Sequence, residues 1–443
     1  MKKQPPLRID IFYAMITLGS TTIWAVLGGW LLYFYLPPEG EGDALVPAAL
    51  YGGTMLITRV LSAVMAPLVG HLSDNTSSRW GRRLPFMFVA ALPMLLFFVL
   101  IWTPPLAHES VWNLVYLGGV LALYNVAYTF HQVPYTALLP GLAQTDQHRV
   151  RISAWTSGIF LLGMILGSLA GPLVEWWGYG GMAVAYALAM LPAFYLPFLV
   201  LREQGGKQAD NTARLNLRQS IAAMLKNKPF LIMTATGLFY WGITTLIQSM
   251  IPYVATEICL LSPADTYSFY VPAIVASLIC YLPVTWLAGR FGKWAVFAGS
   301  LLASAVVLPG IMLIGDWWPV SLHAQGIAWA VLQAVAFSGV SMLPMAFGAE
   351  ITDYDQHLTG QRREGLYYAA WGVLDQVVNG AVAALLPLIL MLGRSRSDPN
   401  GPLGVRLTGV FGGVCMLLAF LVFMRYPLRD GFSIKEMNGE PQD

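Results

Sequence analysis

Charged side chains are scarce in this sequence. Only 11% of its 443 residues are Asp, Glu, Lys or Arg, whereas soluble globular domains carry about 25%. Hydrophobic residues make up 57% of the chain. So little charge excludes a soluble globular protein, because most of the surface must then face lipid or other apolar helices. The composition therefore predicts an all-α integral membrane protein that is surrounded by the lipid bilayer.

Cysteines and catalytic motifs are also few. The three cysteines lie far apart in apolar stretches without CxxC spacing, which excludes a disulfide framework, a zinc site and haem attachment. The sequence holds no GxSxG, HExxH or Walker A motif. We therefore expect no enzyme, no cofactor, no metal and no nucleic-acid partner.

Long apolar runs, by contrast, are abundant. A helix that crosses a bilayer needs about 20 mostly apolar residues. Twelve runs reach this length, and several are long enough to tilt or to extend past the bilayer. They span residues 11–36, 46–73, 85–104, 111–139, 151–174, 179–201, 229–257, 265–288, 294–314, 322–350, 365–393 and 404–425.

Basic residues mark one side of the membrane, because cytoplasmic loops carry an excess of lysine and arginine. With the N-terminus inside, 21 of the 25 lysines and arginines fall in inner segments, three fall in outer loops, and Arg59 lies inside a helix. This distribution predicts that both termini are cytoplasmic, in a multi-pass protein of the cell (inner) membrane.

A polar, basic segment divides the predicted helices six and six. The N-terminal half, the cytoplasmic linker, the C-terminal half and the cytoplasmic tail are then residues 1–202, 203–228, 229–425 and 426–443. Both halves place an Arg-aromatic-Gly-basic pattern at an inner turn, at 70–85 (GHLSDNTSSRWGRRLP) and at 288–294 (AGRFGKW). Two such halves fit the twelve-helix major facilitator fold, in which parallel halves rock about a site at the membrane midplane.

Two charged side chains stand at membrane depth, where charge is costly and usually functional. Arg59 in the second run and Asp375 in the eleventh each lie about 16 Å above the inner surface, at about 1.5 Å per residue. In the major facilitator fold these helices face each other, so we expect an ion pair that bridges the halves. The pair either biases the transport equilibrium or is static and neutralised.

His131 lies near the middle of the fourth run, three residues before Pro134. Proline frees backbone groups one turn back, and irregular backbone at membrane depth is tolerated where it lines a cavity. His131 is therefore a candidate proton carrier. The alternative is a neutral, hydrogen-bonded histidine.

Aromatic rings beside amides and hydroxyls recur on several predicted helices. This combination suits a sugar, whose faces are apolar and whose edges need hydrogen bonds. The candidate substrate-binding residues are Thr21, Trp24, Tyr128, His131, Gln132, Tyr135, Ser157, Tyr240, Trp241, Gln248, Trp371, Asp375, Gln376 and Asn379.

Three stretches carry a family resemblance. Residues 70–85, 133–140 (VPYTALLP) and 349–367 (AEITDYDQHLTGQRREGLY) lie in this order at predicted inner turns. They resemble the glycoside–pentoside–hexuronide cation symporters, the melibiose permease group of the major facilitator superfamily. The resemblance implies secondary active transport of a glycoside or sugar acid, coupled to sodium, lithium or protons.

The sequence departs from that family where the resemblance places the cation site. Melibiose-type members carry two carboxylates on the second helix, and this chain has Ser62 and Ala66 instead. Four further positions carry neutral residues where the family has charged ones: Thr21, Gln132, Ser157 and Gln376. A hard cation needs several oxygen ligands and usually negative charge. Sodium coupling is therefore not expected, while proton coupling through Asp375 or His131 and uniport both stay open.

Charged residues at the predicted inner turns form a candidate cytoplasmic latch, closed when the carrier opens outward. Basic residues of 70–85 would bridge to carboxylates that follow the tenth helix. The alternative role is topology and binding of lipid headgroups. With Arg59, the candidate gating residues are Asp74, Arg79, Arg82, Arg83, Glu350, Asp353, Arg362, Arg363 and Glu364.

The sequence thus predicts a monomeric secondary active transporter of a small sugar, glycoside or sugar-acid-like solute, with a proton as a second candidate partner. One alternative is a carrier of a lysolipid-like or other amphiphilic solute, because the missing charges suit a less polar cavity. Another is a non-transporting membrane protein that retains the fold.

Overall fold

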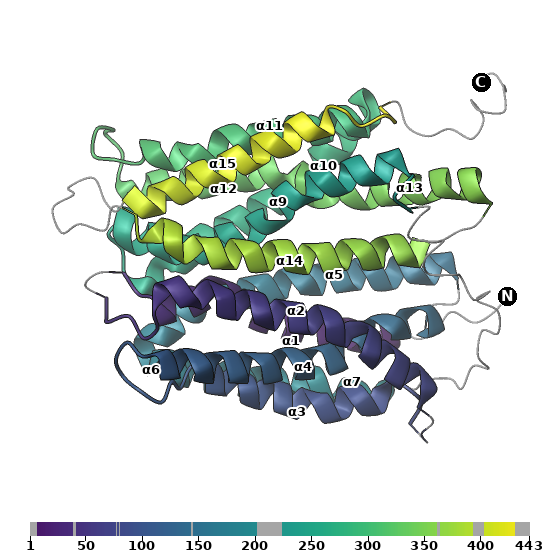
Figure 1. The fold of residues 1–443 in the computed structure, drawn as a ribbon, viewed down its shortest axis with the longest axis horizontal. Coiled ribbons are helices and arrows are strands. Elements are labelled where there is room, and N and C mark those ends of the chain that lie inside the picture. Colours follow the sequence, from purple (N-terminus) through teal and green to yellow (C-terminus); the bar gives the residue numbers. More distant parts are fainter. Residues whose placement is uncertain are drawn as a thin grey trace. The chain divides into compact units, whose positions relative to one another are not determined.

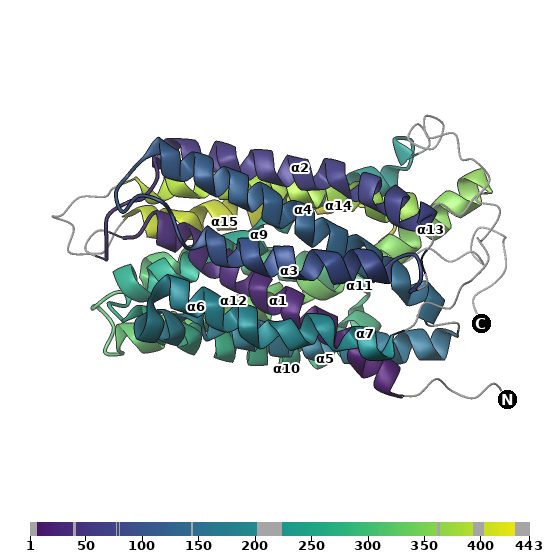
Figure 2. The ribbon, with the colours of Figure 1, turned by 90° about the horizontal axis from the view of Figure 1, so that it is seen from below.

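The computed structural model describes residues 7–38, 41–76, 78, 80–142, 145–201, 224–360, 364–392 and 403–429. Within these ranges every regular element is helical, and twelve helical segments are long and apolar enough to cross a membrane. The predicted runs are confirmed, and with them the all-α membrane fold (Figures 1 and 2).

The helices follow the apolar runs in chain order. The long helices are α1 Leu7–Tyr35, α2 Ala48–Asn75, α3 Leu84–Ile101, α4 Val111–Leu142, α5 Asp146–Ser168, α6 Ala170–Tyr195, α9 Lys228–Tyr253, α10 Tyr267–Phe291, α11 Lys293–Val307, α12 Leu322–Met342, α13 Pro344–Thr359, α14 Glu364–Leu390 and α15 Leu403–Phe423. Short elements complete them: α7 Pro197–Val200, the π-helix η1 Val254–Ile258, and the 3-10 helices η2 Pro263–Thr266 and η3 Leu308–Leu313.

Several predicted boundaries differ from the structure, most clearly in the fifth, sixth and tenth runs. The fifth run extends to residue 174, but α5 ends at Ser168 and α6 begins at Ala170. Gly178, at φ +68°, then kinks α6 where the sixth run begins. The tenth run divides at Leu343 into α12 and α13, because Pro344 has no N–H to continue the helical ladder.

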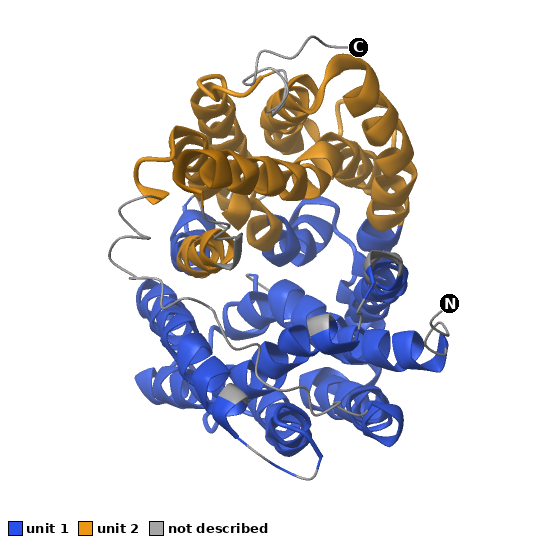
Figure 3. Cartoon of the chain, turned by 90° about the vertical axis from the view of Figure 1, so that its right-hand side faces the viewer, with its two compact units in different colours: residues 1–210, 247–271, 380–402 blue, residues 211–246, 272–379, 403–443 orange. Residues whose placement is uncertain are grey.

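The chain forms two compact units (Figure 3). Unit 1 comprises Met1–Asp210, Ile247–Val271 and Gly380–Pro402, and unit 2 comprises Asn211–Leu246, Pro272–Asn379 and Leu403–Asp443. The end of α9, the start of α10 and the end of α14 therefore pack with the N-terminal helices. The six-plus-six division of the sequence stays a prediction.

In unit 1, α1 lies beside α5, and α4 contacts both α2 and α3 (Figure 2). A buried apolar cluster joins α1, α3, α4 and α5, with the rings of Tyr13 and Tyr135 stacked at a centroid distance of 4.5 Å. Its buried members are Tyr13, Ile16, Leu84, Met87, Tyr135, Leu138, Ile152 and Leu201. The cluster holds one end of α1 against α3, α4 and α5.

In unit 2, α11 packs against α12 and α15. Aromatic rings fill this contact. The ring of Phe297 lies 4.7 Å from that of Phe423, and the ring of Phe347 lies 5.3 Å from that of Tyr426. This aromatic core fixes α13 and α15 next to the start of α11.

Candidate functional site

A cavity of about 270 Å³ lies in unit 2, between α9, α13 and α14. Its wall combines four aromatic rings with two methionines and one carboxylate, the mixture of apolar faces and few polar groups that ligand pockets use. The lining residues are Met233, Tyr240, Trp241, Pro344, Met345, Tyr368, Trp371, Gly372 and Asp375.

Helical spacing explains why these side chains share one wall. Tyr368, Trp371 and Asp375 follow one another at intervals of three and four residues on α14, so they project from the same face. Pro344 begins α13 directly after the break at Leu343. Such a break at membrane depth is tolerated where the backbone lines a cavity.

The aromatic rings of the wall are held by specific contacts. Trp371 Nε1 donates to Thr234 Oγ1 at 2.8 Å, and the Trp371 ring stacks on Phe230 at 5.8 Å. Tyr368 meets Trp371 edge to face, also at 5.8 Å. A Cβ on Gly348 would lie 2.6 Å from the Tyr368 hydroxyl, so this glycine lets the ring approach α13. The wall is therefore built before any ligand enters.

Four predicted substrate-binding residues meet on this wall: Tyr240, Trp241, Trp371 and Asp375. Asn379 lies one turn beyond Asp375, donates to its carbonyl at 2.9 Å and accepts from Thr245 Oγ1 at 2.5 Å. Gln376 is half-buried on α14 and is not a lining residue. Some of the predicted residues on α9 and α14 therefore line the cavity, and others on the same helices do not.

The remaining wall residues are absent from the predicted set. Tyr368 could have been found from its spacing, because it lies three residues before Trp371 on the same helix face. Pro344 carried a signal as a proline inside an apolar run. Met233, Met345 and Gly372 carried none, because apolar residues of membrane helices face lipid, core and cavity alike.

Several predicted residues of unit 1 lie in contacts between helices. The hydroxyl of Tyr135 is 2.8 Å from Thr17 Oγ1, in addition to the stacking of its ring on Tyr13. Gln132 Oε1 accepts from Ser20 Oγ at 3.5 Å. These contacts join α4 to α1.

The other predicted residues of α1, α4 and α5 differ in exposure. Thr21 is buried beside Gly163 of α5, where a Cβ would come 2.9 Å from the Thr21 Cβ. Tyr128 stacks with Tyr124 at 6.1 Å. Trp24 is half-buried and Ser157 is exposed.

His131 lies in an apolar contact between α4 and α6. It is fully buried, and its ring packs edge to face on Phe194 at 4.9 Å. Neither ring nitrogen has a hydrogen-bond partner among the described residues. His131 is not among the residues that line the cavity of unit 2.

Within unit 1, the end of α14 packs closely on α2. A Cβ on Gly52 would lie 2.4 Å from the Cα of Ala384, and a Cβ on Gly380 would lie 3.4 Å from the Cβ of Arg59. Small residues allow this approach of two membrane helices. Arg59 therefore lies beside the residue that follows Asn379, while its ion pair with Asp375 stays a prediction.

The end of α9 packs on α1 in the same unit. Ser249 Oγ donates to the carbonyl of Gly28 at 2.8 Å, and the hydroxyl of Tyr253 donates to the carbonyl of Leu36 at 2.7 Å. The predicted substrate-binding residue Gln248 is buried at this contact, 3.8 Å from Cβ to the position of a Cβ on Gly28. These bonds connect predicted helices one and seven at one end.

The predicted gating residue Glu350 is buried and forms an ion pair with Lys293 inside unit 2. Its Oε2 lies 2.8 Å from Lys293 Nζ, and the hydroxyl of Tyr426 donates to the same oxygen at 3.4 Å. Burial raises the pKa of Tyr426, and the neighbouring Glu350 carboxylate raises it further, so the hydroxyl stays protonated at neutral pH. Glu350 thus fastens α13 to the start of α11.

Other residues of the predicted latch are described only in part. Arg83 Nη1 donates to the carbonyl of Ala137 at 2.5 Å, which joins the start of α3 to α4. Arg82 and Asp353 are half-buried. Arg79, Arg362 and Arg363 lie outside the described residues. The side chains of Asp74 and Glu364 also lie outside the described part of the structure. The latch itself stays a prediction.

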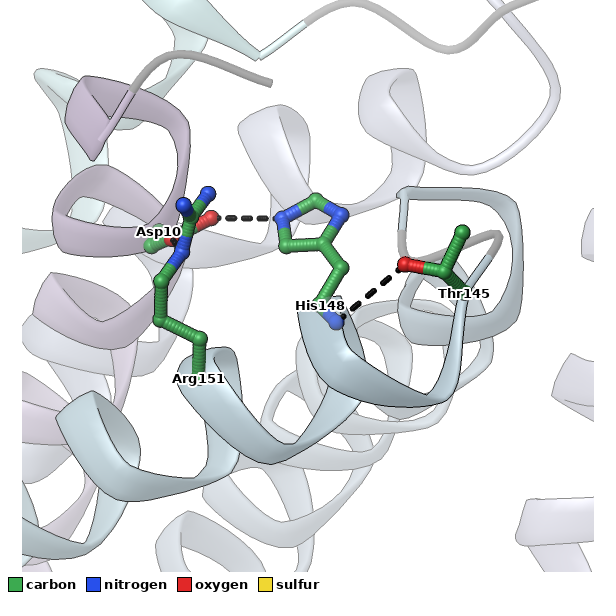
Figure 4. A network of polar contacts seen from close by, with 4 residues as sticks. All are labelled: Asp10, Thr145, His148 and Arg151. Carbon is green, nitrogen blue, oxygen red and sulfur yellow. Dashed lines mark hydrogen bonds and ion pairs between the residues drawn. The ribbon is translucent and has the colours of Figure 1, made fainter. Parts of the chain in front are cut away.

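A buried ion network near the start of α1 was missed by the sequence reasoning (Figure 4). Asp10 is fully buried, its Oδ1 lies 2.8 Å from His148 Nε2, and Arg151 Nε donates to its Oδ2. Thr145 Oγ1 accepts from the backbone N of His148 at 3.3 Å and so caps the turn that carries both partners. A buried carboxylate is stable only with such partners.

An uncharged contact lies at the start of α9 in unit 2. Asn227 Oδ1 accepts from the backbone N of Phe230 at 3.0 Å, and Nδ2 donates to the hydroxyl of Tyr367 at 3.1 Å. Asp10 ties α1 to α5. Asn227 ties the start of α9 to α14.

Comparison with known proteins identifies the group to which these features belong. Residues 12–430 match the family described as MFS/sugar transport protein. The chain is 25% identical over 397 residues to the isoprimeverose transporter of Lactiplantibacillus pentosus, covering 86% of this chain and 79% of that one. It is 27% identical over 454 residues to the glucuronide carrier protein homolog of Escherichia coli (strain K12), covering 97% and 94%.

A solved structure shares the fold. The crystal structure of a D-xylose-proton symporter superposes with a TM-score of 0.69 at 12% identity, covering 96% of this chain and 98% of that one. At this identity the likeness shows the fold alone. The twelve-helix major facilitator fold is therefore confirmed.

Proposed function

Because the chain belongs to the MFS/sugar transport protein family, we propose that it carries a sugar, glycoside or sugar-acid-like solute by alternating access. The glycoside–pentoside–hexuronide resemblance of its motifs is confirmed by relatives that include glycoside and glucuronide carriers. The chain is a secondary transporter of the inner membrane and not an enzyme. Its substrate and its coupling ion are the subject of the proposal.

The observation that carries the proposal is the cavity of unit 2. Aromatic faces from α9 and α14 meet one carboxylate, Asp375, at a break between α12 and α13. A sugar ring has apolar C–H faces that pack on aromatic rings and hydroxyl edges that need polar partners. Tyr240, Trp241, Tyr368 and Trp371 would supply the faces, and Asp375 would accept from a hydroxyl.

Proton coupling at Asp375 is the mode of energisation that the geometry favours. Asp375 is on the cavity wall, so its protonation can respond to substrate, whereas His131 is buried against Phe194. The hydroxyl of Ser62 donates to the carbonyl of Thr58 at 3.4 Å in its own helix, and Ala66 has no ligand atom. A sodium site at these positions on α2 would therefore lack the charged oxygen ligands that a hard cation requires.

The experiment is solute counterflow in proteoliposomes with a panel of labelled sugars and glycosides, followed by uptake with and without sodium and with an imposed pH gradient. We expect counterflow of at least one sugar, uptake driven by the pH gradient and no response to sodium. Failure of every sugar to exchange would overturn the proposal.

The apolar part of the wall favours one alternative, a carrier of amphiphilic solutes. Met233 and Met345 line the cavity beside the aromatic rings, and methionine adapts to irregular apolar ligands. Flux of a labelled lysolipid in the same proteoliposomes, competing with no sugar, would support this alternative.

A further inference from the structure

We infer that the cavity of unit 2 takes the uncharged ring of a neutral glycoside and discriminates against carboxylated or sulfonated sugars. The inference rests on the proposed sugar transport and narrows its substrate class. It is carried by the charge, the ring orientation and the volume of the cavity.

The charge of the wall opposes an anion. None of the nine lining residues is lysine, arginine or histidine, and the one carboxylate among them is Asp375. An anionic substrate that enters this cavity loses hydration and gains no cationic partner from the wall. If Asp375 forms the predicted pair with Arg59, the two charges cancel, and the wall still offers no excess positive charge.

The indole of Trp371 has no free N–H for a ligand. The one N–H of the Trp371 indole is already bonded to Thr234 Oγ1 at 2.8 Å, so this ring offers a ligand its π-face and no donor. Phe230 stacks on Trp371, and the plane of the Tyr368 ring is inclined at 80° to that of Trp371. A flat, fixed aromatic surface of this kind binds C–H faces of an uncharged ring.

The volume matches a single sugar ring. Ligand pockets for drug-sized molecules span about 300–1,000 Å³, and this cavity measures about 270 Å³. One pyranose ring fits this space, with an aglycone or second ring directed outward. A carboxylate at C6 that enters the cavity with this ring meets a wall without lysine, arginine or histidine.

The test measures equilibrium binding to the purified full-length protein in nanodiscs, with tryptophan fluorescence as the readout. The two probes are methyl β-D-glucopyranoside and methyl β-D-glucuronide, which differ only in the oxidation of C6. We expect the neutral glucoside to bind at least about tenfold more tightly, because the glucuronide carries an unpartnered charge.

The outcomes separate this inference from the proposed function. Equal or tighter binding of the glucuronide overturns the inference and leaves sugar transport standing. Binding of neither probe overturns the inference, and no counterflow of any sugar overturns the proposed function as well.

A charge variant sharpens the assay. Asp375→Asn removes the negative charge, and we expect it to reduce the preference for the glucoside about tenfold. The matched control is Asp316→Asn, which removes an exposed carboxylate outside the cavity and should leave the preference as it is in the parent. An unchanged preference in Asp375→Asn would overturn the electrostatic part of the inference. Binding is measured rather than transport, so loss of proton coupling does not obscure the result.

Discussion

The carboxylate of Asp10 lies 2.8 Å from Nε2 of His148, in a fully buried position at the start of α1. Arg151 donates to the other oxygen of the same carboxylate. Both partners stand on the first two turns of α5, so one side chain fastens two long helices together. We expect α1 and α5 to move as one body during transport.

Removing this carboxylate should destabilise the protein. Asp10→Ala leaves the partly buried charge of Arg151 and the ring of His148 without their partner, at a cost of about 3 kcal/mol. The measurement is the thermal unfolding midpoint in detergent. Asp43→Ala, in the exposed loop after α1, is the control and should unfold with the parent. An Asp10→Ala midpoint equal to that of the parent would show that the network stabilises nothing.

Crowding the cavity wall should weaken substrate binding. A Cβ on Gly237 would come 2.5 Å from the ring of Trp241, so Gly237→Ala must displace that ring from the wall. The displaced ring no longer meets the substrate in the same way, and we expect KM to rise about tenfold, which corresponds to a loss of about 1.4 kcal/mol of binding free energy. Gly119→Ala on α4, where a Cβ meets nothing within 4 Å, is the control. Equal KM values for the two variants would show that the Trp241 ring does not contribute to substrate binding.

Uptake driven by a pH gradient can show which residue carries the coupled proton. Asp375→Asn should keep counterflow and lose accumulation under a pH gradient, because the variant side chain cannot exchange a proton. His131→Gln should keep accumulation driven by the gradient, even if its rate falls, since His131 lies in an apolar contact with Phe194 and is not among the lining residues. The opposite pattern would place coupling at His131.

A cross-link between α1 and α9 should arrest transport reversibly. The Cβ of Gln248 is 3.8 Å from the position of a Cβ on Gly28, and disulfides join Cβ atoms at about 3.8 Å. If the two six-helix halves part during the cycle, oxidation of the Gly28→Cys/Gln248→Cys variant stops counterflow. A reductant then restores the counterflow rate that this variant had before oxidation. The native thiols replaced beforehand are Cys259, Cys280 and Cys415.

The control pair lies within the N-terminal half. A Cβ on Gly118 of α4 would come 3.0 Å from Cγ2 of Thr54 of α2. Oxidised Thr54→Cys/Gly118→Cys should transport at the rate of its reduced form, because α2 and α4 belong to one moving half. Arrest by both pairs, or by neither, would contradict the six-plus-six division.

The fold followed from the sequence because lipid leaves the backbone little choice. Every N–H and C=O at membrane depth must be satisfied inside a helix, so apolar run length alone located the twelve spans. The boundaries that failed, at Ser168 and Leu343, depend on local kinks that hydropathy does not record.

The site was predicted only where a polar or aromatic side chain recurs at helical spacing. Tyr240, Trp241, Trp371 and Asp375 meet on one wall as that spacing suggested. Met345 and the partners of Asp10 could not be found in this way. Apolar residues look alike whether they face lipid or a cavity, and the pairing of Asp10 with His148 joins residues that are 138 positions apart.

The most direct measurement compares counterflow of labelled methyl β-D-glucopyranoside by the parent, by Trp371→Leu and by Trp112→Leu. Trp112 is exposed at the start of α4 and serves as a matched tryptophan outside the cavity. We predict counterflow by the parent and by Trp112→Leu, and a KM at least about tenfold higher for Trp371→Leu. If the parent does not exchange this glycoside, the same comparison uses the sugar of the counterflow panel that it does exchange. No counterflow of any sugar by the parent, or the same KM for both variants, would contradict a sugar carrier whose substrate binds in the cavity of unit 2.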